Sequence, residues 1–208
     1  MSAKNRRHQD FSNTLLDYLK EIKWPNKVIE AAGKISPLFL NQNITTLWQA
    51  IEYVQKLPYG RNTDRKNYSQ VLTEKRGACS TKHALIAALA QEMGIALNLT
   101  LVIFLLNSRN TPKIAPILEC YHLTAVPEAH CYLTYNNKVL DVTFPDSKEF
   151  SFYSNVEEEF IITPEQISFF KLEKHQTFIK KWIKSNTDLN FELIWNIREQ
   201  CIQKLSQI

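Results

Sequence analysis

The sequence has little glycine, with only 4 in 208 residues, and its 8 prolines are scattered. This scarcity excludes a flexible or proline-rich linker, and no internal repeat is present. We therefore expect a single domain that spans residues 1–208, a length at which one hydrophobic core is sufficient. The hydrophobic fraction of 44% and the charged fraction of 22% are those of an ordinary soluble globular protein.

The sequence also lacks a hydrophobic run long enough to be a membrane span, which takes about 20 residues. Its longest run, Ile95–Leu106, is shorter and contains polar residues, so it predicts a buried strand. The opening residues MSAKNRRHQD contain no apolar segment of the kind that signal peptides carry. We expect a cytoplasmic protein with no membrane partner.

Cysteine is sparse, and charge of one sign is in no large excess. Four cysteines (Cys79, Cys120, Cys131 and Cys201) lack the spacing of a disulfide framework, which predicts reduced thiols. The net charge is +4, and the basic residues are scattered among acidic ones. No basic stripe interleaved with aromatic residues stands out, so we expect no nucleic-acid partner.

Helical spacing of apolar residues predicts three helices in the first half of the chain, over 11–24, 44–54 and 79–93. Asn43 is the expected N-cap of the second helix, and Gly94 is expected to end the third. The third helix is rich in alanine, so we expect neighbours to crowd it on several sides. That places it at the centre of the domain.

Beyond the third helix, the pattern becomes that of strands. We expect a buried strand over 97–106, a long loop that includes a short strand over 107–129, and a hairpin over 130–144. Asn136–Asn137 is the predicted turn of the hairpin, because asparagine tolerates positive φ. After an irregular acidic and aromatic stretch, helices resume at Thr163, where Thr-Pro-Glu-Gln forms a capping box. Helices, antiparallel strands and again helices predict the α+β class.

Cys79 is predicted to lie in the first turn of the third helix. Unpaired backbone N–H groups and the positive end of the helix dipole favour the thiolate there, which is the form that attacks carbonyl groups. The Cys79 N–H is also well placed to donate to an oxyanion. We expect Gly77 to let the chain turn sharply and to leave room for substrate. On position alone, a small structural cysteine explains the residue equally well.

The register of the hairpin brings a histidine and a carboxylate to one face. With Asn136–Asn137 as the turn, His130 lies opposite Thr143, and Asp141 takes a diagonal position about 7–8 Å away at the backbone. Aspartate is disfavoured in strands, and a half-buried carboxylate needs a partner. An aspartate that accepts from a histidine N–H fixes the tautomer and supports the imidazolium. Alternatively, Asp141 caps a bend or is solvated at an edge.

Two segments resemble the core of the transglutaminase-like superfamily, whose fold is related to papain-like thiol proteases: RGACSTKHALIAALAQEMGI and AHCYLTYNNKVLDVTF. The resemblance lies in a glycine shortly before a cysteine on an alanine- and leucine-rich helix, followed by histidine on one strand and aspartate on the next. Upstream, LWQAIEYVQKLPYG resembles the helix that commonly precedes the cysteine. The resemblance covers 44–145 and leaves 1–43 and 146–208 as helical additions.

The resemblance implies a papain-like core in which a central cysteine helix packs on an antiparallel sheet. It also implies roles for three residues: Cys79 as nucleophile, His130 as base and acid, and Asp141 as the orienting carboxylate. The implied function is a thiol-dependent amide-bond enzyme (a peptidase or amidase, a deamidase or an acyltransferase) that acts through a thioester. Its substrate would be a peptide, a protein or a small amide, and no cofactor or metal is needed.

Two positions differ from the family pattern. Ser80 stands where many members carry a bulky aromatic residue. No tryptophan precedes Cys79 in the segment where a second oxyanion donor is expected, so Gln70 or Tyr68 is the candidate for that role. Both differences leave the substrate and the acyl acceptor open.

His83 follows the cysteine by four residues and shares its side of the helix. Together with His130 and Asp141 it allows a metal-site interpretation, but no close pair of ligands in the usual short spacings supports it. We expect instead a residue that supports the catalytic groups or contacts the substrate, or a plain helix-face histidine. His8 and His175 are predicted to face solvent. A second class of function is a catalytically silent peptide- or protein-binding module on the same fold, in which the thiol is not used.

Overall fold

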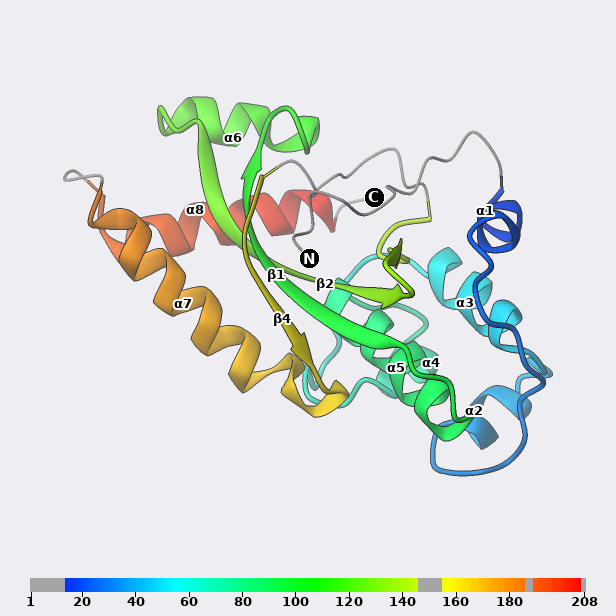
Figure 1. Cartoon of the computed structure of the whole chain (residues 1–208). Helices are drawn as coiled ribbons and strands as arrows, with labels where there is room; N and C mark the ends of the chain where they lie inside the picture. The colour runs from blue at the N-terminus through cyan, green and yellow to red at the C-terminus, as the bar shows by residue number, and fades with distance from the viewer. Residues whose placement is uncertain (1–13, 146–154, 186–188, 207–208) are drawn as a thin grey trace.

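The protein forms a four-stranded antiparallel sheet with helices on both sides (Figure 1). The computed structural model describes residues 14–145, 155–185 and 189–206. The sheet order is β3-β2-β1-β4, and the α+β prediction is confirmed. The strands are β1 (Asn98–Asn107), β2 (Ala125–Tyr135), β3 (Lys138–Leu140) and β4 (Val156–Ile162).

In chain order, the helices form two groups, one before β1 and one after it. Those before it are α1 (Leu15–Glu21), α2 (Ser36–Leu40), α3 (Leu47–Lys56), α4 (Gln70–Glu74) and α5 (Cys79–Glu92). Those after it are the 3-10 turn η2 (Pro112–Ile114), α6 (Ala115–Cys120), the 3-10 turn η5 (Pro164–Ile167), α7 (Phe169–Ile183) and α8 (Phe191–Leu205). In Figure 1 the long, curved strands β1 and β2 run between the α3–α5 group and the pair α7 and α8. No helix in this described part of the chain is long and apolar enough to cross a membrane.

Helix α3 begins three residues later than the apolar spacing predicted. Its N-cap is Thr46, whose Oγ1 accepts from the Gln49 N–H at 3.3 Å, while Gln49 Oε1 accepts from the Thr46 N–H at 3.1 Å. This reciprocal pair is a capping box. Asn43 has a φ of 59° and lies in a turn before the helix, so its prediction as the N-cap was wrong.

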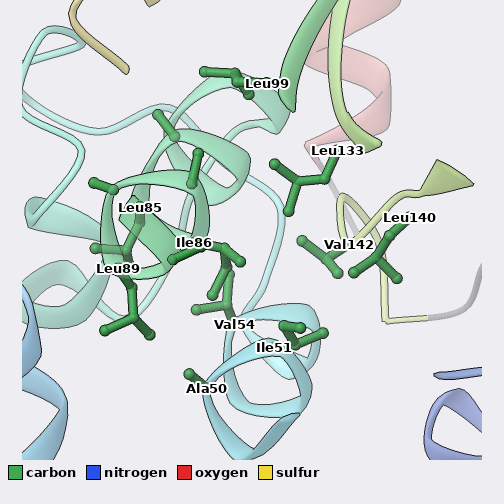
Figure 2. Packing of buried hydrophobic residues seen from close by; sticks show 14 of the residues in the cluster. Ala50, Ile51, Val54, Leu85, Ile86, Leu89, Leu99, Leu133, Leu140 and Val142 are labelled. Carbon is green, nitrogen blue, oxygen red and sulfur yellow. The ribbon is translucent and has the colours of Figure 1, made fainter. Parts of the chain in front are cut away.

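Helix α5 lies at the centre of the molecule, as its alanine content predicted. Every residue from Cys79 to Ala90 is buried. Figure 2 shows leucine and isoleucine side chains of α5 packed in one cluster with side chains of α3 and of the hairpin. Gly94 has a φ of 64° and follows the end of the helix, which confirms the predicted stop.

The apolar run in β1 is a strand buried on both faces. Leu99, Leu101 and Ile103 pack in the same cluster as α3 and α5. The alternating residues Val102 and Phe104 belong to a second cluster, which includes side chains of α8. A strand covered on both faces reads as a continuous apolar run rather than an alternating one.

The hairpin has the predicted register. Tyr135 pairs with Lys138, and both turn residues, Asn136 and Asn137, have positive φ. The regular ladder ends at the Leu133–Leu140 pair, so the predicted pairing of His130 with Thr143 is not part of it. Asp141, expected on a strand, follows the end of β3.

Two stretches differ from the prediction. The loop expected over 107–129 contains α6 and the first half of β2, which pairs with β1 back to Ala125. The stretch expected to be irregular contains β4, which pairs with the other side of β1. Strand β4 was missed because it contains three consecutive glutamates, 157–159. Charged residues are common on edge strands, and they break the apolar alternation by which a strand is predicted. The segment 146–208 therefore contributes a strand as well as helices.

Candidate active site

Cys79 is the first residue of α5, and Ala78 is its N-cap. The chain before it is pinned to the preceding connection, because the Gly77 N–H donates to Pro58 O and the Gly60 N–H donates to Gly77 O, both at 3.2 Å. The position in the first helical turn is the one predicted from the sequence. The Cys79 N–H belongs to the groups at a helix start that have no intrahelical acceptor.

The lack of a side chain at Gly77 allows close packing of neighbouring protein side chains and does not leave space for a substrate. A Cβ at this position would lie 2.8 Å from Val71 Cγ2 and 2.9 Å from Lys82 Cγ. Protein side chains therefore fill the space that the missing side chain leaves. The expectation that Gly77 leaves room for a substrate was wrong.

His130 and Asp141 form a short hydrogen bond at the base of the hairpin. The His130 Nε2–H donates to Asp141 Oδ2 at 2.7 Å, and Asp141 Oδ1 accepts from the Thr143 N–H at 2.9 Å. His130 is only 3% exposed. His130 and Cys79 line the same small pocket, and the charge of each stabilises the charge of the other. The structure thus brings the three residues together.

The charges around Cys79 favour its thiolate. Burial alone would raise the pKa of the thiol, but the positive charges of Lys171 and His130 outweigh it and lower that pKa to about 6. Burial opposes the charged form of His130 too, yet Asp141 and Cys79 raise the pKa of the imidazole to about 9. The same pairing holds the pKa of Asp141 below its usual range. Between these two values the pair exists as thiolate and imidazolium.

His83 ties the start of α5 to the segment after β3. Its Nδ1–H donates to Cys79 O at 2.7 Å, and its Nε2 accepts from the Val142 N–H at 2.8 Å. Burial lowers the pKa of this histidine to about 4, which agrees with a neutral ring. The residue is fully buried, so the expectation of a plain helix-face histidine was wrong. Its bond to the Cys79 carbonyl agrees with the alternative of a residue that supports the site from behind.

The same contacts argue against a metal site. Backbone groups occupy both ring nitrogens of His83, which leaves the ring no lone pair for a metal ion. Within the described ranges, no group of three or more His, Cys, Asp or Glu side chains is arranged to hold a metal.

Lys82 is a second buried anchor that the sequence did not suggest. Its Nζ donates to Leu57 O at 2.6 Å and to Thr143 O at 2.8 Å, and the side chain is fully buried. These bonds join α5 to the end of α3 and to the segment that carries Asp141. Together, Lys82 and His83 fix the nucleophile relative to the carboxylate.

A cavity of about 310 Å³ opens onto Cys79 and Ser80. It lies between the start of α5, the connection after α3, and the helices α7 and α8. Apolar and basic side chains both line it. The apolar ones include Phe169, Leu172, Trp195 and Ile202. The basic ones are Arg61, Arg65, Lys66, Lys171 and Arg198. Cys79 therefore borders this cavity, whereas His130 borders a separate, smaller pocket that also includes Cys79.

Neither Gln70 nor Tyr68 lines this cavity. Gln70 begins α4, and its Oε1 accepts from the Asp64 N–H at 2.8 Å. Tyr68 packs against the larger hydrophobic cluster. The structure does not bring either side chain to Cys79, so it does not support the prediction of Gln70 or Tyr68 as an oxyanion donor.

Helix α7 contributes a lysine that sequence reasoning missed. The Lys171 Nζ donates to Ser80 Oγ at 2.6 Å and lies 3.5 Å from Cys79 Sγ. One turn further along, His175 Nε2–H donates to Pro127 O at 2.9 Å. His175 is buried, so its predicted solvent exposure was wrong; His8 lies outside the described residues.

The floor of the cavity contains a buried ion pair. Arg198 Nη2 donates to Glu128 Oε1 at 2.7 Å, and Arg198 Nε donates to Glu128 Oε2 at 2.5 Å. Arg198 also contacts Glu199, which in turn accepts two hydrogen bonds from Arg61. This network fastens α8 to β2 and to the connection that follows α3.

We expect iodoacetamide to alkylate Cys79 with an apparent pKa near 6, because the rate follows the thiolate fraction. Peptide-resolved mass spectrometry over a pH series measures this. Cys131 and Cys201 are internal controls that should stay unmodified, since burial raises their thiol pKa values to about 12 and about 11. Exposed Cys120 is the accessible reference. A Cys79 profile centred near the free-thiol value of about 8.5 would contradict the expected charge environment.

Protein-family models, curated proteins and solved structures were each compared with the chain, and none of the three comparisons found a match.

Proposed function

We propose that the chain is a thiol enzyme with a papain-like core, a member of the transglutaminase-like superfamily, that cleaves or transfers the acyl group of an amide. The observation that supports this most is the position of His130. One ring nitrogen is held by Asp141 at 2.7 Å, and the ring shares a small pocket with Cys79, where the charges of the two groups stabilise each other. A lowered thiol pKa at a cavity is typical of nucleophilic cysteines.

In the proposed reaction, Cys79 Sγ attacks the carbonyl carbon, and the π electron pair moves onto the oxygen. The C–N bond then breaks, His130 gives its proton to the leaving amine, and a thioester remains. Neutral His130 next takes a proton from water or from an acceptor amine, which attacks the thioester and releases Cys79. Asp141 keeps the ring in the tautomer that these transfers need.

The acceptor decides between hydrolysis, deamidation and crosslinking, and the cavity is compatible with each. The substrate class remains a peptide, a protein or a small amide. The Cys79 N–H is the backbone donor for the oxyanion. This chemistry uses no metal and no organic cofactor.

The test is acetylation of the protein by p-nitrophenyl acetate, an activated ester that forms the same kind of thioester. We expect a burst of p-nitrophenolate equivalent to the protein present, and an acetyl adduct on the Cys79 peptide. Cys79→Ala should abolish the burst. Cys120→Ser, which removes the exposed thiol, is the matched control and should keep it.

Wild-type protein that is acetylated at Cys120 but not at Cys79 would count against the enzyme. That result would favour the other class of function, a silent binding module whose cavity holds a peptide without reaction.

A further inference from the structure

Helix α7 places an ammonium group beside the nucleophile, on the side of the cavity. The Lys171 side chain is half-buried and lines the cavity together with Cys79 and Ser80. Its Nζ is held by Ser80 Oγ at 2.6 Å and is 3.5 Å from Cys79 Sγ. An ammonium has three donors, so beyond these two contacts one N–H remains for a group in the cavity.

The two cations next to the sulfur differ in what they can do. His130 is held in the hairpin by Asp141, and an imidazole exchanges protons near neutral pH. The pKa of Lys171 is raised: burial would lower it, but the negative charges of Cys79 and Glu128 more than compensate. Lys171 therefore keeps its charge and acts as a fixed donor rather than as a base.

The position of Lys171 also fits the group that appears during attack. In the tetrahedral intermediate, the oxyanion is two bonds away from Cys79 Sγ, on a carbon that lies in the cavity. A donor 3.5 Å from the sulfur on the same side can reach that oxygen. Gln70 and Tyr68, the candidates from the sequence, lie elsewhere.

We propose that Lys171 is a catalytic residue whose ammonium donates to the oxyanion formed at the substrate carbonyl, together with the Cys79 N–H. This proposal rests on the proposed acyl transfer at Cys79. Ser80 serves as the positioning residue that holds the ammonium at the cavity. Serine at this position thereby has a role that a bulky aromatic residue could not fill.

Two reagents separate this role from a simple effect on the thiol. With iodoacetamide, the thiolate displaces iodide from a methylene carbon, so a C–S bond forms, a C–I bond breaks and no oxyanion appears. With p-nitrophenyl acetate, the thiolate adds to the carbonyl carbon and the π electron pair moves to the oxygen; the pair then returns and p-nitrophenolate leaves. Both reactions need the thiolate, but only the second needs an oxyanion donor.

The experiment measures both rates at Cys79 over a pH series in wild type, Lys171→Met and Lys171→Arg. In Lys171→Met we expect the pH profile of the alkylation rate to shift to higher pH. Once the thiol is fully ionised, the rate should reach that of wild type. Acetylation should stay slower by about 10²–10³-fold even where the thiol is fully ionised, as after loss of one oxyanion donor. Lys171→Arg keeps the charge, so its acetylation rate should lie between those of wild type and Lys171→Met.

Lys174→Met is the matched control. Lys174 lies three residues further along α7 with its ammonium over the Phe160 and Phe170 rings, at 5.4 and 5.1 Å from their centroids. Neither rate should change in this variant. Circular dichroism establishes that each variant is folded. If Lys171→Met does not fold, Ser80→Ala takes its place, because it releases the ammonium without removing it, and acetylation should fall more than alkylation.

Equal loss and equal recovery of both rates would overturn the proposal: Lys171 would then only lower the thiol pKa, and the acyl-transfer function would stand. Wild-type protein that is alkylated but never acetylated at Cys79 would instead refute the function, and the role of Lys171 with it.

Discussion

Replacing His130 with alanine is expected to slow hydrolysis of the acetylated Cys79 by about 10²–10⁴-fold, the usual contribution of a general base. Water must lose a proton as it attacks the thioester, and the variant has no group at this position to accept it. The variant also loses the imidazolium that helps to lower the thiol pKa, so alkylation should shift to higher pH. The steady-state phase after the p-nitrophenolate burst measures the hydrolysis rate.

The two variants should differ in the step that stays slow at high pH: acetylation in Lys171→Met, and hydrolysis in His130→Ala. The acetylation step expels p-nitrophenolate, which leaves without a proton, so in His130→Ala it should recover once the thiol is ionised. Only hydrolysis should remain slow. His122→Ala is the matched control, because His122 is an exposed histidine outside the cavity. A His130→Ala variant with unchanged hydrolysis would remove the histidine from the mechanism.

Replacing Arg198 with methionine is expected to cost about 3–5 kcal/mol of the free energy of unfolding, measured by urea denaturation. The side chains of Arg198 and Glu128 are 10% and 7% exposed, so the variant leaves a buried carboxylate without its partner. Arg61→Met is the matched control. It breaks a pair with Glu199 whose side chains are about one-third exposed, for which a cost of about 0–1 kcal/mol is expected.

The Arg198–Glu128 pair also predicts how the free energy of unfolding changes with pH. Burial alone would raise the pKa of Glu128, but the charge of Arg198 holds it below its usual value. The pair's contribution to stability is therefore complete above the pKa that Glu128 has in the unfolded chain, and it is lost as pH falls through the folded-state pKa. Acidification should destabilise wild type more than Arg198→Met. Equal costs for Arg198→Met and Arg61→Met at neutral pH would contradict the importance of the buried pair.

The hydrogen bond between His130 and Asp141 could be predicted from the sequence because it depends on local geometry. Once Asn136 and Asn137 form the turn, the strands pair as far as Leu133 and Leu140, and the bond to Asp141 forms directly beyond the end of this ladder. The start of α5 is equally local, since its boundary is visible in the change from a polar segment to an alanine-rich helix. These two local features account for three of the residues at the site.

Lys171 and His175 could not be predicted in the same way. Their positions depend on how α7 docks against β2, and no short-range pattern in the sequence reports that packing. The burial of His83 was missed for a related reason. Helical spacing places it on the same side as Cys79, but it does not say that the segment after β3 covers that side with a backbone N–H.

The contact between Lys171 and Cys79 joins residues 92 positions apart, and this separation has a consequence for biosynthesis. On the ribosome, Cys79 and its hairpin partners emerge well before the helix that carries the lysine. Until α7 docks, the sulfur lacks one of the two charges that stabilise its ionised form, and a protonated thiol is a poor target for oxidants. Docking of α7 therefore completes the charge environment of this sulfur only after most of the chain has been synthesised.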